Sequence, residues 1–139
     1  MKKVAVSACL LGRNCRYDGS HRLDSELIEN LADKEVIPFC PEEAILGTPR
    51  ETIDIVEGRA VGNESGRDYT EAIEKQAEEF ARLYPDIEEL YCKAKSPSCA
   101  LCSARVYDAK GNLISHQGMG IFTKRLKAVL PKILIKERR

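Results

Sequence analysis

The chain has 139 residues, a length that suits one domain with a single core, and we expect residues 1–139 to fold as one unit. Lys and Arg together number 22, as do Asp and Glu, so the formal net charge is zero. Nucleic-acid-binding proteins usually carry a basic excess, and no apolar run here approaches the roughly 18 residues of a membrane span. Composition and charge therefore argue against a nucleic-acid or membrane partner.

The amino-terminal segment contains Val-Ser-Ala-Cys, a pattern typical of lipoprotein cleavage sites, ending at Cys9. Only about five apolar residues precede this cysteine, whereas a signal peptide needs roughly 7–15. Cleavage would also remove a predicted strand, so we expect a cytoplasmic protein. Six cysteines in a reducing compartment are more often metal ligands or catalytic thiols than disulfides.

The first half of the chain is predicted to alternate strands and helices. Apolar runs and turn signals indicate, in chain order, a buried strand at 3–8, a helix at 25–32 capped by Asp24, a buried strand at 35–39, and a loop at 42–50. A hairpin follows at 52–61, with its turn at Glu57-Gly58. Asp68 and Glu71 form a capping box for a helix that ends near Tyr84.

The second half continues this alternation. It is predicted to contain a strand at 87–94, a β-pair at 104–108 and 113–115, a helix at 121–129, a strand at 132–135 and a solvated tail at 136–139. Strands alternating with helices favour an α/β fold with a mainly parallel sheet. We expect a Rossmann-like three-layer arrangement to which the hairpin at 52–61 is added.

Three cysteines follow three of the predicted strands. Cys9 ends the first, Cys40 ends the second, and Cys99 lies just after the third. Ligands of open parallel sheets bind beyond the carboxyl ends of the strands, so these thiols are expected to converge at one edge. Three thiolates would hold a metal site with one open position, as catalytic sites require.

The residue pattern alone leaves the metal open. Thiolates suit both zinc and iron–sulfur clusters, and a zinc site from Cys9, Cys15, Cys99 and Cys102 is an alternative. Cys99 and Cys102 also form a C-x-x-C pair, which is compatible with thiol redox chemistry or with a metal-free thiol enzyme that carries a persulfide. Cys92 lies inside a strand and is expected to be a packing residue.

Several short motifs together resemble the TudS-type thiouracil desulfurase family, which was long catalogued only as a domain of unknown function. The motifs run in order over nearly the whole chain: Val6-Ser-Ala-Cys-Leu-Leu-Gly12, Asn14-Cys-Arg-Tyr-Asp-Gly19, Cys40-Pro-Glu42, Thr48-Pro-Arg-Glu51, Gly66-Arg-Asp-Tyr-Thr70 and Ser96-Pro-Ser-Cys99. One departure is Ala100, where a glycine is usual, and the nearby Cys102 is a possible alternative ligand.

The resemblance implies a [4Fe–4S] cluster bound by Cys9, Cys40 and Cys99, with one iron open to substrate sulfur. It also implies that Glu42 and Ser96 assist the chemistry. Substrates of the family are thiolated pyrimidines, including thiouracil and thiouridine monophosphate, and the members that act on tRNA carry a further domain. The expected activity, part of sulfur metabolism, replaces sulfur by oxygen and releases sulfide without net redox change.

The expected roles follow from ordinary acid–base chemistry. Glu42 would deprotonate the attacking water, and Ser96 would hydrogen-bond the ring or relay a proton. Tyr17, Asp18 and Ser98 are expected to contact the substrate. Basic or helix-start groups suited to a substrate phosphate are Arg50, Arg67 and the Gly118/Gly120 turn, while His21 and His116 are expected at the surface.

Overall fold

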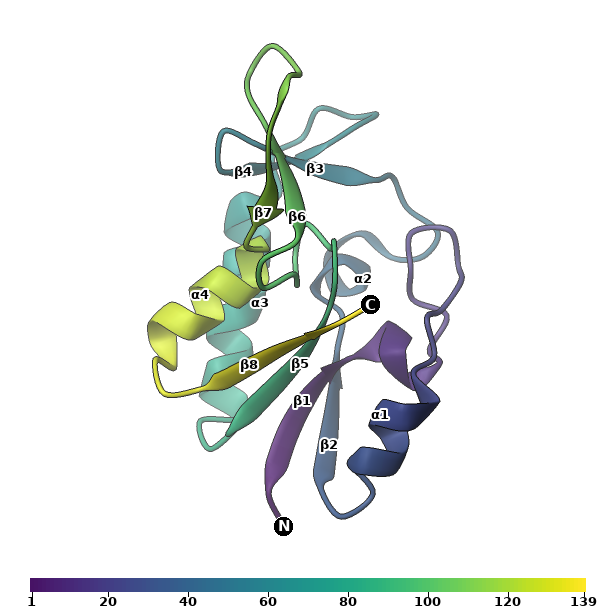
Figure 1. Ribbon diagram of the computed structural model, residues 1–139. Coiled ribbons are helices and arrows are strands. Elements are labelled where there is room, and N and C mark those ends of the chain that lie inside the picture. Colours follow the sequence, from purple (N-terminus) through teal and green to yellow (C-terminus); the bar gives the residue numbers. More distant parts are fainter.

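The computed structural model describes all residues from Met1 to Arg139. Its central sheet contains four parallel strands in the order β2-β1-β5-β8 (Figure 1). These strands are β1 (Lys3–Ser7), β2 (Glu35–Phe39), β5 (Glu89–Lys93) and β8 (Leu134–Arg138). All four run in the same direction, so their carboxyl ends lie at one edge of the sheet.

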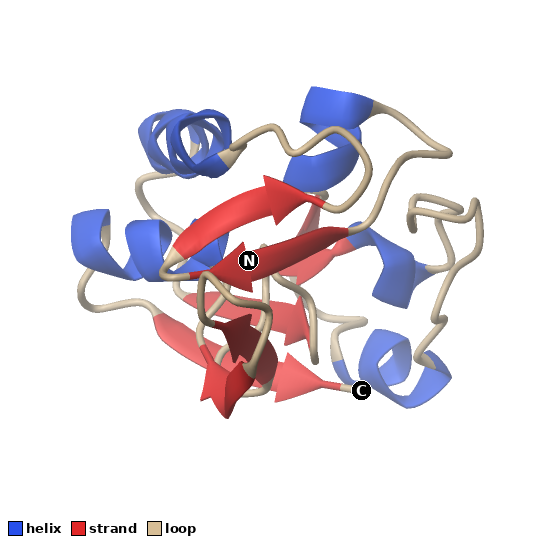
Figure 2. Ribbon diagram, turned by 90° about the horizontal axis from the view of Figure 1, so that it is seen from above, coloured by secondary structure: helices blue, strands red, loops and turns tan.

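Helices cover both faces of this sheet (Figure 2). Helix α1 (Ser25–Asn30) packs on one face, where its Leu27 joins a buried cluster with Val4 and Val6 of β1. Helices α3 (Thr70–Leu83) and α4 (Ile121–Val129) pack on the other face. The alternation along β1 produces this division, because successive side chains of a strand point to opposite faces. The expected three-layer α/β class is confirmed.

Three aromatic rings fill the layer between the sheet and helices α3 and α4. Phe39 stacks on Phe122 with ring centroids 5.0 Å apart, and Phe80 lies within 6 Å of both rings. Offset and edge-to-face rings of this kind add stabilisation beyond their buried area. Phe39 immediately precedes Cys40, so this packing fixes the carboxyl end of β2.

The hairpin predicted at 52–61 is part of a larger unit than expected. Strands β3 (Ile53–Val56), β4 (Arg59–Gly62), β6 (Ala104–Tyr107) and β7 (Leu113–Gly118) form a second sheet in the order β4-β3-β6-β7. Glu57 and Gly58 make the predicted turn with φ of 49° and 78°, the left-handed values of a type I′ turn. Strand β3 pairs in parallel with β6, which joins the two predicted β-pairs into one mixed sheet.

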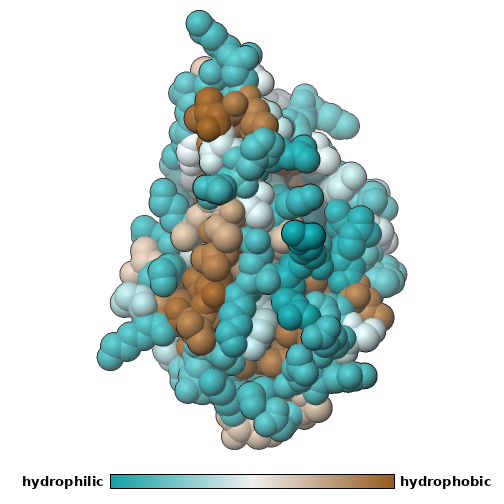
Figure 3. Space-filling view, in the orientation of Figure 1, coloured by the Kyte–Doolittle hydropathy of each residue, from teal (hydrophilic) through white to brown (hydrophobic).

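The surface of this second sheet is partly apolar. Figure 3 shows a mostly hydrophilic face with apolar residues gathered over the β6–β7 hairpin, where Leu113 and Ile114 are 41% and 61% exposed. No helix is long and apolar enough to cross a membrane.

Three local predictions are wrong. The capping box expected from Asp68 and Glu71 does not form, because α3 begins at Thr70 after Tyr69 and the Asp68 carboxylate accepts from the Thr70 amide and from Arg59. The loop expected at 42–50 begins instead with a short helix, α2 (Pro41–Leu46), because proline is favourable in the first turn of a helix, where its missing N–H has no partner to lose. The tail expected at 136–139 belongs largely to β8, which pairs with β5 through Arg138.

A single 3-10 turn, η1 (Ala8–Leu11), follows β1 and carries Cys9.

The Asp24 cap predicted from the sequence is confirmed, since its carboxylate accepts a hydrogen bond from the Leu27 amide at 3.0 Å. The same carboxylate pairs with Arg138 of β8 at 2.8 Å, which lowers the pKa of Asp24. Stability from a lowered carboxyl pKa is present above the ordinary value near 3.9 and is lost as the pH falls through the folded-state pKa.

Replacing Asp24 with alanine is expected to reduce the free energy of unfolding by about 1–2 kcal/mol at pH 7, since both the cap and the partly buried ion pair are lost. Asp24→Asn keeps a good cap, so its free energy of unfolding should fall only by the smaller contribution of the ion pair. Urea unfolding at pH 7 and pH 3 measures both effects, and the wild-type advantage should shrink at the lower pH. An equal loss in the two variants would contradict the assigned cap.

Candidate functional site

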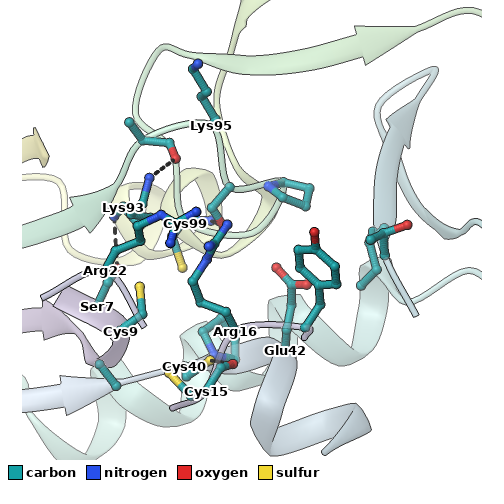
Figure 4. A pocket seen from close by; sticks show the side chains of 18 of the residues that line it. Ser7, Cys9, Cys15, Arg16, Arg22, Cys40, Glu42, Lys93, Lys95 and Cys99 are labelled. Atoms are coloured by element: carbon teal, nitrogen blue, oxygen red, sulfur yellow. Dashed lines mark hydrogen bonds between the residues drawn. The ribbon is translucent and has the colours of Figure 1, made fainter. Parts of the chain in front are cut away.

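A cavity of about 590 Å³ opens at the carboxyl end of the parallel sheet, and β3 and β6 of the second sheet contribute to its wall (Figure 4). Strand β1 delivers Cys9 through η1, β2 is followed at once by Cys40, and β5 leads to Cys99. These strands are neighbours in the sheet, so thiols from distant parts of the chain reach one cavity. The expected convergence is found, while the role of the thiols as ligands stays a prediction.

A fourth thiol, that of Cys15, lines the same cavity. Its side chain is 1% exposed, and the Cys40 sulfur lies 3.7 Å from its carbonyl oxygen. Cys102 is exposed and lies outside the cavity lining, so the neighbour that competes with the three expected ligands is Cys15. Cys92 is buried in β5 with its sulfur 3.5 Å from the Lys136 carbonyl, which agrees with a packing role.

The surroundings of the thiols favour their protonated forms. The hydrogen bond that Cys40 donates to Cys15, together with burial, raises the pKa of Cys40, and burial raises the pKa of Cys99. The pKa of Cys15 is lowered by its contact with Cys40 but raised more strongly by its hydrogen bond to Cys9 and by burial, to about 11. Only the pKa of Cys9 is lowered, mainly because Cys15 donates to its sulfur. A metal would have to displace these protons on binding.

The donor set suits a cluster. Cys9, Cys15, Cys40 and Cys99 line one cavity, and thiolates are the usual ligands of iron–sulfur clusters. Thiolates bind zinc as well, so the donor chemistry by itself suits either metal.

Glu42 lies in the first turn of α2 and lines the cavity. Its Oε2 accepts a hydrogen bond of 2.8 Å from the Ser98 hydroxyl, and its Oε1 lies 3.6 Å from Arg50 Nε. The Glu42 side chain is only 12% exposed, so these two neighbours fix its orientation. The carboxylate is therefore a fixed acceptor on the wall of the cavity.

The predicted serines divide into two environments. Ser96 lines the cavity, and its hydroxyl oxygen accepts hydrogen bonds from the amides of Ser98 and Cys99, which shapes the turn before the thiol. Ser98 is fully buried, and its hydroxyl is directed to Glu42 rather than to the cavity. Ser98 does not line the cavity and its hydroxyl is bonded within the protein, so its expected contact with the substrate stays a prediction.

Arg50 differs from its expected role. Its Nη1 donates to the carbonyls of Cys15 and Gly47 and to the Thr48 hydroxyl, and its side chain is 6% exposed. Its Nε is buried without a hydrogen-bond partner, with the Glu42 carboxylate as its nearest charge. Arg50 lines the cavity, and its Nη1 joins the Cys15 loop to the end of α2, so the protein itself uses this nitrogen.

Of the other expected binding residues, only Tyr17 lies at the cavity. Tyr17 lines the cavity, but Asp18 is an exposed turn residue that accepts from the amide and hydroxyl of Ser20. Arg67 belongs to a separate surface hollow. The helix start after Gly120 is not free for an anion, since the first amides of α4 donate to carbonyls of the 97–100 segment.

Gly120 has a steric rather than an anion-binding role. A Cβ at this position would overlap the Ser98 carbonyl, so only glycine allows α4 to approach the loop that carries Cys99. Five cations of the cavity wall were missed by the sequence reasoning: Arg16, Arg22, Lys93, Lys95 and Arg105. Arg16 lies within the Asn14-Cys-Arg-Tyr-Asp-Gly19 motif, and the other four are scattered along the chain where no local motif marks them. With Glu42 and Asp54 as the only lining acids, the cavity attracts anions.

The fold and the site define a class: an α/β protein with a cysteine-rich, cationic cavity at the carboxyl ends of three adjacent parallel strands. The model of the family described as 2-thiouracil desulfurase matches residues 4–138, so the chain belongs to that family. This confirms the resemblance carried by the sequence motifs.

Two similar proteins support this assignment. The solved structure of the [4Fe-4S]-dependent thiouracil desulfidase TudS is 33% identical, with a TM-score of 0.76, and the match covers 99% of this chain and 91% of that one. The uncharacterized protein YbbK of Bacillus subtilis (strain 168) is 30% identical over 138 residues, covering 89% of each chain.

Proposed function

We propose that this protein is a cytoplasmic [4Fe–4S]-dependent desulfidase that converts a thiolated pyrimidine, thiouracil or 4-thiouridine monophosphate, to the oxo-pyrimidine and sulfide. The observation that carries the proposal is the meeting of Cys9, Cys40 and Cys99 in one cavity with the carboxylate of Glu42. Membership in the 2-thiouracil desulfurase family and likeness to TudS support both the reaction and the cofactor. All six cysteines are free thiols, which suits a reducing compartment.

The three thiols are the residues that would hold the cluster. When bound, the cluster would have one iron without a protein ligand and would supply Lewis acidity toward the soft sulfur of a thiocarbonyl group. Lys93, half-buried beside Cys9, favours the thiolate of that residue, while Cys40 and Cys99 have raised pKa values and would lose their protons as the cluster binds.

Glu42 would hold and deprotonate the attacking water. Its Oε2 is occupied by Ser98, which leaves Oε1 as the acceptor for a water proton. The water oxygen adds to the ring carbon, the carbon–sulfur bond breaks, and the sulfur leaves as sulfide. Water and the thiocarbonyl compound thus give the carbonyl compound and hydrogen sulfide, and no electrons are gained or lost. Ser96 is the second candidate to contact the ring, since it lines the cavity beside Cys99.

The excess of cations favours a phosphorylated substrate over a free base. Replacing Arg22, an exposed residue of the cavity wall, with alanine is expected to lower kcat/KM for 4-thiouridine monophosphate about tenfold, the value of one charge-assisted hydrogen bond. The value for 4-thiouracil should stay within about twofold, since this substrate has no phosphate. The matched control is Arg125→Ala, which removes a guanidinium paired with Glu78 outside the cavity. Equal losses on both substrates would show that Arg22 does not recognise phosphate.

Anaerobic purification followed by a sulfide-release assay tests the proposed function itself. We expect iron and inorganic sulfide in the protein and stoichiometric sulfide from thiouracil, 4-thiouridine or its monophosphate. A zinc-loaded protein that keeps its metal in Cys40→Ala would support the non-catalytic alternative, in which the cysteines hold a structural metal. Turnover by metal-free protein, with a persulfide detected by mass spectrometry, would support the metal-free thiol enzyme.

A further inference from the structure

The loop at 95–103 joins β5 to β6 and carries three residues of the proposed site: Ser96, Ser98 and Cys99. One side of this loop is held by the start of α4. The Gly120, Ile121 and Phe122 amides donate to the carbonyls of residues 100, 97 and 98 at 2.7, 3.0 and 2.9 Å. The loop thus satisfies the amides that a helix leaves unpaired at its first turn.

The other side of the loop is held by one carboxylate oxygen, Oε2 of Glu137 in β8. It accepts hydrogen bonds from the Leu101 amide at 2.9 Å, the Cys102 amide at 3.1 Å and the Ser103 hydroxyl at 2.8 Å. Three donors on one charged oxygen make a strong anchor, because hydrogen bonds to an ionised acceptor are roughly twice as strong as neutral ones.

The same network closes the loop at its base. The Ser103 hydroxyl oxygen accepts a 2.7 Å hydrogen bond from the Lys95 amide while its proton is donated to Glu137, so residues at both ends of the loop meet at this carboxylate. Lys95 has a φ of 66°, a left-handed conformation that costs free energy for a residue other than glycine. The hydrogen bond through Ser103 holds Lys95 in this conformation, with its side chain on the cavity wall.

We infer that Glu137 is a positioning residue that closes the 95–103 loop and sets Cys99 in place before any cofactor binds. The inference rests on the proposed function only in taking Cys99 as a ligand. Because the loop also carries Ser98, the anchor fixes the relative placement of Cys99 and Glu42. Partners outside the ligand set that orient a metal ligand commonly change metal affinity by 10–100-fold.

The test compares Glu137→Gln and Glu137→Ala with Glu89→Gln as a matched control. Glu89 is also a buried carboxylate of the same sheet, but it lies at the amino end of β5, and its two oxygens pair with Lys2 and Lys136. In the metal-free proteins, amide hydrogen exchange of residues 96–103 is measured beside the melting temperature. In cluster-loaded proteins, the rate of iron release to a chelator is measured.

We expect Glu137→Ala to speed exchange of the 96–103 amides and to release iron at least about tenfold faster than wild type. Glu137→Gln, which retains an acceptor oxygen, should show amide-exchange and iron-release rates between those of Glu137→Ala and wild type. Glu89→Gln should leave loop exchange and iron release unchanged even if it lowers the melting temperature equally. Should Glu137→Ala fail to fold, Ser103→Ala removes the link to Lys95 and is expected to show the same changes more weakly.

Loop exchange as slow in Glu137→Ala as in wild type, or iron release equally accelerated in Glu89→Gln, would overturn the inference. Failure of the proposed function would look different. A protein that takes up no cluster, or that releases no sulfide, would leave the exchange measurement on the metal-free chain decisive for the role of Glu137.

Discussion

Replacing Cys40 with serine is expected to yield a folded protein without iron or visible cluster absorbance and with sulfide release at least 100-fold below wild type. Serine retains the size of the side chain, but its oxygen is a hard donor that suits iron–sulfur clusters poorly. Cys40 directly follows β2 and is half-buried at the cavity wall, so the change removes a ligand without opening a core cavity. Iron and sulfide analysis after anaerobic reconstitution, with a melting curve, measures the result.

The other cysteines supply the controls for this experiment. Cys92→Ser and Cys102→Ser should bind iron as wild type does, since neither sulfur lines the cavity. The Cys15→Ser variant decides whether the third ligand is Cys99 or Cys15, because Cys15 shares the cavity with the predicted ligands. Retention of iron by Cys15→Ser and its loss from Cys9→Ser and Cys99→Ser are expected. The reverse result for the Cys15 and Cys99 variants would move the third ligand to Cys15.

The convergence of the thiols was predictable because it depends on strand order alone. Apolar runs locate the strands at 3–8, 35–39 and 87–94, and parallel pairing places the residue that follows each strand at the same edge. The helix at 121–129 was equally accessible, since its apolar spacing and the preceding glycine are local signals. Such signals depend only on residues close together in the sequence, so distant contacts in the folded chain do not change what they predict.

The errors arise where a distant partner decides the structure. Residues 136–138 are charged and their composition predicts a solvated tail, yet β8 adds to the sheet, with Lys136 pairing with Glu89 and Arg138 with Asp24. The charged side chains are neutralised by partners more than 40 residues away, which no local pattern reveals. Helix α2 differs from the predicted loop for another reason, because its 6 residues are too few to show an apolar periodicity.

The site residues that were found differ in their sequence signals from those that were missed. Cysteines are uncommon and the Glu42 motif is distinctive, whereas Arg22, Lys93 and Arg105 are common surface residues that only the fold brings to one cavity. Asp18 and Arg50 are suited to ligand contact by type, but the protein already uses Oδ1 of Asp18 in a turn and Nη1 of Arg50 between two loops.

Cluster-loaded Glu42→Gln is expected to bind substrate but to release sulfide 10²–10⁴-fold more slowly than wild type, the usual contribution of a general base. Glutamine keeps the shape of the side chain and can still accept the Ser98 hydrogen bond, so the site should stay folded and retain iron. It cannot take a proton from water, and the loss should therefore appear in kcat rather than in KM.

The matched control for Glu42→Gln is Glu43→Gln, the adjacent residue of α2, whose carboxylate pairs with Arg13 and accepts from the Thr48 hydroxyl away from the cavity lining. Single-turnover measurements, in which the loss of the thiocarbonyl absorbance and the appearance of sulfide are followed together, separate chemistry from product release. Rapid turnover by iron-loaded Glu42→Gln, or an equal loss in Glu43→Gln, would remove Glu42 from the role of base. The fixed orientation of Glu42, with one oxygen bonded to Ser98 and the other near Arg50, argues for the large and selective loss.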